Sequence, residues 1–102
     1  MTDGIVYGAG WSLDDVQWDK FDRAKLDPTL VAAVKAAALV EFNAPDYVIY
    51  LKRVFKESGA EMLANIEQWG IEEVQHGEAL GRWAQIADPT FDFKASFTRF
   101  RE

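Results

Sequence analysis

The sequence predicts an all-α protein built on two long helices that fold back on each other as an antiparallel hairpin. Apolar residues recur at alternating spacings of four and three over residues 28–56, and again over residues 60–87. This spacing is typical of one face of an α-helix. A short segment near residue 58 joins the two stretches, so the helices must run antiparallel.

The composition fits one small domain with a core. The chain has 102 residues, of which 49% are hydrophobic and 14% aromatic, a heavy aromatic load for two helices that hints at a partner surface or a continuation of the chain. The net charge of −6 disfavours nucleic acid and anionic membranes as partners. The absence of Cys excludes disulfides, thiolate zinc sites and iron–sulfur clusters. Because there is neither a signal peptide nor an apolar run of spanning length, we expect a cytoplasmic protein.

Residues 1–27 form a polar leader that contains scattered aromatic residues. Within it, Ser12-Leu-Asp-Asp15 resembles a capping box, which predicts a short helix near 13–24. Asp27-Pro28 is a stronger helix start, with Asp as the cap and Pro in the first turn. The hairpin is therefore expected over residues 28–88.

The first long helix is expected to run to about Lys56. Pro45 removes the hydrogen bond to the carbonyl of Glu41, four residues earlier. We interpret this as a kink, because the apolar spacing continues through it. The alternative is a helix end, with Asn43 capping a new segment.

The second long helix is expected to follow a capping box at Ser58-Gly-Ala-Glu61 and to end at Ala87, before Asp88-Pro89. Three glycines share one of its sides: Gly70, Gly77 and Gly81. Glycine destabilises a helix by about 1 kcal/mol relative to Ala. Three on one side therefore indicate close helix approach, with a cofactor or substrate channel as the weaker alternative.

Residues 89–102 form an aromatic tail. Phe93, Phe97 and Phe100 fall on one helical face, which predicts a short amphipathic helix. This face is expected to pack either on the end of its own bundle or on another chain.

The two apolar stripes, which we call the seams, are interrupted by polar residues at only three places. The seam of the first helix comprises Leu30, Val34, Ala37, Glu41, Ala44, Val48, Leu51 and Phe55. That of the second comprises Met62, Ile66, Trp69, Glu73, His76, Leu80, Trp83 and Ala87. Glu41, Glu73 and His76 lie at similar distances along the chain from the turn, so the hairpin would place them at one height.

Burying two ionised carboxylates together costs several kcal/mol and adds mutual repulsion. A divalent cation relieves this cost, and a set of carboxylates and an imidazole suits iron, manganese or zinc. In the metal-free alternative the acids are protonated or face solvent, or His76 pairs with Glu73.

Glu73-Val-Gln-His76 is a Glu-x-x-His element level with a Glu on the preceding antiparallel helix. In this combination the chain resembles the ferritin-like superfamily of di-iron carboxylate proteins, of rubrerythrin and ferritin type. There, two helices each give one Glu and two others each give a Glu-x-x-His. The resemblance implies that Glu41 and His76 are terminal ligands and that Glu73 bridges two metal ions.

The resemblance covers about residues 28–88, which would be half of a ferritin-like four-helix bundle. The chain resembles the N-terminal helical hairpin of a bacterial ferritin-like protein, and a second hairpin must supply the missing ligands. A second copy would do so in a homodimer, as in encapsulated ferritins; the alternative is a missing C-terminal half. Glu72 and Glu78 fall off the seam and are expected to be solvated.

The function implied is that of a di-metal protein with two iron ions per complete bundle, manganese or zinc being alternatives. It would be an oxidoreductase or ferroxidase that uses O₂ or peroxide, with no catalytic residues beyond the metal ligands. Tyr47 and Tyr50 flank the seam and either relay an electron or wedge between helices, while Trp69 is expected to keep the site dry. The rivals are a metal-free helical interaction module and a purely structural metal site.

Overall fold

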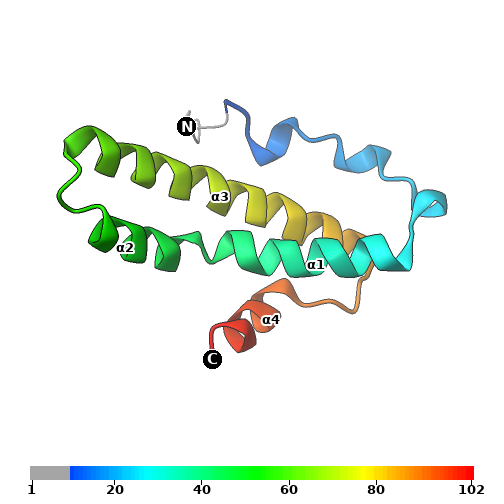
Figure 1. The fold of residues 1–102 in the computed structure, drawn as a ribbon. Helices are drawn as coiled ribbons and strands as arrows, with labels where there is room; N and C mark the ends of the chain where they lie inside the picture. Colours follow the sequence, from blue (N-terminus) through cyan, green and yellow to red (C-terminus); the bar gives the residue numbers. More distant parts are fainter. Residues whose placement is uncertain (1–9) are drawn as a thin grey trace.

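The computed structural model describes residues 10–102, and within this range the chain is helical with no strand, as the sequence predicts. Helix α3 runs back alongside α1 and α2, and α4 lies across the pair (Figure 1). In chain order the elements are the short 3-10 turns η1 (Leu13–Asp15), η2 (Trp18–Lys20) and η3 (Arg23–Lys25), and the helices α1 (Pro28–Phe42), α2 (Ala44–Val54), α3 (Ala60–Ala87) and α4 (Phe93–Phe100).

The outer ends of the helix pair lie where the sequence predicts them. Helix α1 begins at Pro28, and the carboxylate of its cap residue Asp27 accepts a hydrogen bond of 2.8 Å from the N–H of Thr29. Helix α3 ends at Ala87, where the backbone N–H of Asp88 donates to the carbonyl of Ala84. Both boundaries are set by local chemistry and are confirmed.

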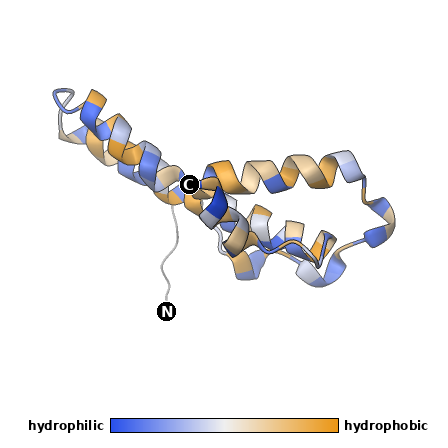
Figure 2. Ribbon diagram, turned by 90° about the horizontal axis from the view of Figure 1, so that it is seen from below, coloured by the Kyte–Doolittle hydropathy of each residue, from blue (hydrophilic) through white to orange (hydrophobic). Residues whose placement is uncertain are grey.

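The first long helix is divided in two at Asn43, so the prediction of one kinked helix is wrong. Pro45 has no N–H to donate to the carbonyl of Glu41, and the Asn43 N–H instead bonds the Val40 carbonyl at 3.2 Å. Asn43 sits between the helices as in the alternative prediction, although its side chain makes no capping bond. Helix α2 follows α1 in the projection of Figure 1, whereas Figure 2 shows the chain changing direction between the two helices.

The turn between α2 and α3 also differs from the predicted capping box. The residue that caps α3 is Gly59, with φ of +95°, and it makes no side-chain bond. Glycine suits this left-handed conformation because it has no Cβ. Ser58 lies one residue too early to cap the helix, and its N–H donates to the Phe55 carbonyl at 2.9 Å.

Small residues bring α3 close to α1 and α2. A Cβ added to Gly77 would lie 2.5 Å from the backbone nitrogen of Phe42, and one added to Gly70 would collide with Val48. Ala38 of α1 and Ala84 of α3 are fully buried in the same contact. The close approach predicted from the glycines is confirmed.

The leader does not form the predicted helix over 13–24. Its 3-10 turns follow α3, where Phe21 packs on Trp83 with ring centroids 5.7 Å apart. The Arg23 guanidinium donates to the carbonyls of Ile86 and Ala87 at 2.9 and 3.2 Å. These long-range anchors hold residues 11–25 of the leader along α3, and the local bond from the Ser12 N–H to Asp15 supports only a single turn. Residues 1–9 of the predicted leader lie outside the described residues.

The predicted tail helix is confirmed as α4, and it packs on its own chain. The rings of Phe93 and Phe97 lie 5.2 and 4.8 Å from that of Phe42. Gly81 makes room for the Phe93 ring, which a Cβ there would meet at 2.7 Å. Of the two packing alternatives, the intramolecular one is therefore correct.

Helix α1 is apolar on nearly every side, and Figure 2 shows its ribbon almost wholly in the hydrophobic colours. A helix of this kind normally lies inside a larger core. Here Leu30 and Val40 are 49% and 46% exposed. On the seam of α3, Met62 and Trp69 are 39% and 40% exposed. The seams are uncovered only in part, because other members of them are buried: Ala44, Val48 and Ile66. None of the helices in residues 10–102 combines the length and apolar character needed to cross a bilayer.

Candidate metal centre

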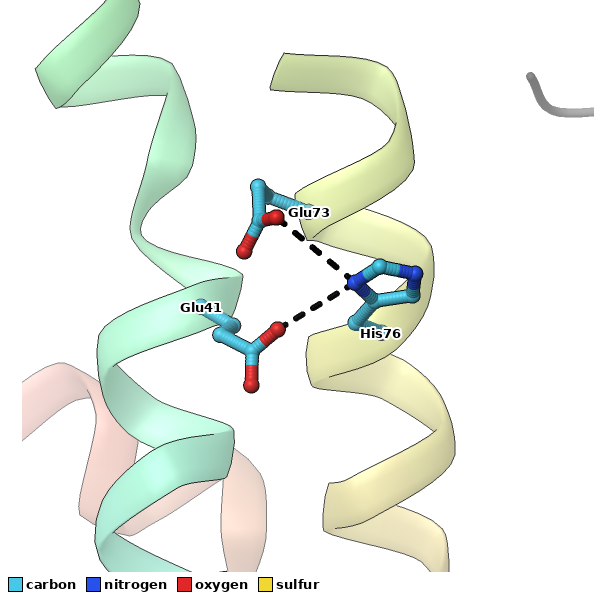
Figure 3. A group of neighbouring side chains, drawn as sticks. All are labelled: Glu41, Glu73 and His76. Carbon is cyan, nitrogen blue, oxygen red and sulfur yellow. Dashed lines mark ion pairs between the residues drawn. The ribbon is translucent and has the colours of Figure 1, made fainter. Parts of the chain in front are cut away.

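The three polar seam residues meet between α1 and α3. Glu41 lies in the last turn of α1, and Glu73 and His76 lie one turn apart on α3, so that all three side chains point toward one another (Figure 3). The Nδ1 atom of His76 is 3.3 Å from Oε1 of Glu41 and 3.6 Å from Oε1 of Glu73. One potential ligand atom from each residue lies within 4.8 Å of the other two.

These separations fit a shared metal ion. Nitrogen and oxygen ligands bind Zn²⁺ at about 2.1 Å, which places two ligands of a tetrahedral ion about 3.4 Å apart. The distances from His76 to the two carboxylates, 3.3 and 3.6 Å, bracket this value. The chemistry of the set, two carboxylates and one imidazole, suits zinc, iron and manganese alike.

The electrostatics of the cluster favour a cation. Burial raises the pKa of Glu73 above its usual value, and the neighbouring Glu41 carboxylate raises it further. The negative charge of Glu72 acts in the same direction, and the His76 imidazole opposes it. Keeping both carboxylates ionised here therefore carries a cost that a bound cation would remove. In the metal-free form of the same arrangement, His76 pairs with the two acids.

The cluster is partly open to solvent on the seam face. The side chains of Glu41, Glu73 and His76 are 27%, 23% and 37% exposed, respectively. Three protein ligands leave coordination positions that a further group can fill. Any such group would approach from the solvent-open side of the cluster.

The other residues singled out in the sequence lie further from this chemistry. Tyr47 and Tyr50 on α2 are both exposed, Tyr50 by 63%. Trp69 is also exposed and lines a surface hollow with Leu51 and Ile66, so within one chain it does not seal the cluster. Glu78, which was expected to be solvated, is half-buried, and burial raises its pKa.

Sequence reasoning missed two residues that contact the cluster. The indole of Trp11 stacks on the imidazole of His76, with ring planes 5° apart and centroids separated by 6.3 Å. Gln75 is fully buried, and its Nε2 donates to the Trp11 carbonyl. Gln75 stands inside the Glu-x-x-His element, but nothing in the local pattern indicates a partner 64 residues away.

Comparison of the chain with models of known families, with curated proteins and with solved structures found no match in any of the three. The case for a metal centre therefore rests on the chain's own residues and their geometry.

Proposed function

We propose that this chain is a di-metal carboxylate protein of ferritin-like type, whose complete site forms when two hairpins join through their seams into a four-helix bundle. The observation that carries the proposal is the meeting of Glu41, Glu73 and His76 on an otherwise apolar seam. Charged groups are retained among apolar ones at such cost mainly where they bind or react.

The uncovered seams support a second hairpin as the partner. Large apolar residues of the seams are exposed in the single chain, among them Trp69, about one turn from Glu73, and Leu30, about three turns from Glu41. Contiguous apolar surface of this kind is typical of an interface. A second copy would cover it and would double the ligand set to the four Glu and two His of a di-iron bundle. A C-terminal half of similar sequence could supply the same second hairpin. In a solution of this chain alone, the second hairpin would come from another copy.

The roles follow from the positions. Glu73 would bridge the two ions with its counterpart, while Glu41 and His76 would each bind one ion. Bound iron would supply electron-transfer chemistry toward O₂ or peroxide, as in an oxidoreductase or a ferroxidase. The protein would hold the ions, and the paired seams would keep the surrounding volume dry.

The proposal predicts that the chain binds about one Fe(II) per protomer under anaerobic conditions, and that exposure to air then produces near-ultraviolet charge-transfer absorption. Glu73→Ala should abolish binding, because it removes the bridging carboxylate. Glu72→Ala is the matched control: Glu72 is the neighbouring acid and lies outside the cluster, so this variant should still bind about one Fe(II) per protomer. Failure of the wild-type chain to bind, or full binding by Glu73→Ala, would refute the site.

A metal-free interaction module is the second candidate. The position of His76, within ion-pair distance of both acids, supports it because the cluster can neutralise part of its own charge. An absence of metal binding together with retained self-association would favour this candidate. A structural zinc or manganese site would instead bind metal without a spectral change on redox cycling.

A further inference from the structure

Gln75 is the largest fully buried side chain in residues 10–102, and it is polar. Burying an amide is costly unless its groups are hydrogen-bonded. Its Nε2 donates to the Trp11 carbonyl, whereas its Oε1 has no partner among the described residues. The one hydrogen bond of the amide therefore goes to the backbone of Trp11, whose ring lies parallel to that of His76.

The rest of the leader holds Trp11 at a fixed height on α3. The Trp18 indole N–H donates to the Leu13 carbonyl at 2.8 Å, and the Arg82 guanidinium lies 4.6 Å from the Trp18 ring centre. Further along, Arg23 donates to the carbonyl of Ile86. With these anchors along its length, the segment that carries Trp11 cannot slide past His76 without breaking several contacts.

The contact constrains the orientation of a proposed ligand. An imidazole rotates readily about its second side-chain torsion, because that torsion has broad minima. The Trp11 ring lies nearly parallel to the His76 ring, on which Nδ1 faces both carboxylates. A smaller side chain in place of the indole would leave more room for the imidazole to rotate. Hydrogen-bonding partners that fix the ring of a metal-ligating His commonly change metal affinity 10–100-fold when they are removed, and we expect the parallel Trp11 ring to act at the lower end of this range.

We propose that Trp11 is a positioning residue for the metal centre: held by Gln75, it keeps the His76 imidazole turned toward Glu41 and Glu73. This inference rests on the proposed function, since it assumes that the cluster binds metal. It adds a part of the chain outside the long helices to the site, and it gives the leader a role beyond covering α3.

The test is Co²⁺ binding by the full chain, measured by calorimetry and by the visible absorption of the bound ion. Trp11→Ala should weaken binding on the order of 10-fold and alter the absorption band, with unchanged helix content. Trp11→Phe should restore both, because a ring remains. Gln75→Leu should behave as Trp11→Ala does. Leucine is similar in size to glutamine, but it cannot donate the hydrogen bond to the Trp11 carbonyl.

Val16→Ala is the control, since Val16 is an exposed leader residue whose side chain is not among the anchors that hold Trp11. It should leave Co²⁺ affinity and absorption unchanged. Equal affinity for wild type and Trp11→Ala would overturn this inference while leaving the proposed function intact. Equal weakening by Val16→Ala would also overturn it, because the leader would then act only through stability. No Co²⁺ binding by the wild type would refute the proposed function and this inference together.

Discussion

Helix α3 has two apolar faces that are built in opposite ways. The face toward α1 and α2 carries Gly70, Gly77 and Ala84, all buried, and it meets its neighbours almost backbone to backbone. The seam face carries Met62 and Trp69, both exposed, together with the partly exposed Glu73 and His76. Small residues complete the first contact within one chain. Large apolar residues beside the proposed ligands form the second face, which the proposed partner would cover.

The largest expected effect is on association through the seam. Trp69→Lys should weaken self-association at least about 100-fold, because burial of a large aromatic ring is lost and a charge is placed in the interface. Sedimentation analysis over a range of concentrations measures this. Ile71→Lys is the matched control, since Ile71 is equally exposed, at 40%, and lies off the seam of the same helix. If both variants associate like the wild type, the seam is not the interface.

A smaller effect is expected from filling the glycine face. A Cβ at position 77 would press on the backbone of Phe42, which cannot move aside without shifting α1. Overpacking at this position should cost about 2 kcal/mol. The higher helix propensity of alanine returns only about 1 kcal/mol, so Gly77→Ala should lower the free energy of unfolding.

Gly70→Ala sharpens the same comparison, because the Cβ there meets the side chain of Val48 rather than backbone. Its loss in unfolding free energy should be smaller than that of Gly77→Ala in urea denaturation. If Gly70→Ala lost as much unfolding free energy as Gly77→Ala, or more, the contact of Gly77 with the Phe42 backbone would not be the tighter of the two.

The smallest expected effect is on stability, through the ion pair between Lys35 of α1 and Asp88, which follows the last residue of α3. Lys35 donates to Asp88 at 2.7 Å, and bonds from Lys35 and Thr90 lower the pKa of Asp88 to about 2. Because the folded-state pKa lies below the ordinary 3.8, the pair stabilises the fold above that pH, and its contribution is lost as the pH falls toward 2.

Asp88→Asn should accordingly lower the melting temperature slightly at pH 6, and the difference from wild type should shrink as the pH falls from about 4 to about 2. Circular dichroism at several pH values measures this. A difference that stays constant down to pH 2 would show that the charge of Asp88 is not responsible.

The parts of the fold that depend on neighbouring residues could be predicted from the sequence. Asp27-Pro28 starts α1 and Asp88-Pro89 follows the end of α3, because capping and proline act within one turn. Pro45 announces a disturbance, but whether a helix bends or divides there depends on tertiary packing. The shape of the leader depends on α3, as the bonds from Arg23 to carbonyls 63 and 64 residues away illustrate.

The same division applies to the candidate site. Heptad spacing and the position of the turn predict that Glu41, Glu73 and His76 meet, and the structure brings them together. Trp11 could not be predicted, because no periodicity links the leader to His76. Metal binding itself stays a prediction, since two carboxylates and an imidazole can also pair without an ion.

The central claim is that the cluster is half of a site that a second copy completes. Native mass spectrometry of the wild-type chain after anaerobic loading with Fe(II) tests it most directly, with Glu73→Ala measured beside it. The account predicts a species of two chains and two metal ions that loses its metal in the variant. A wild-type chain that stays monomeric and metal-free under the same conditions would contradict it.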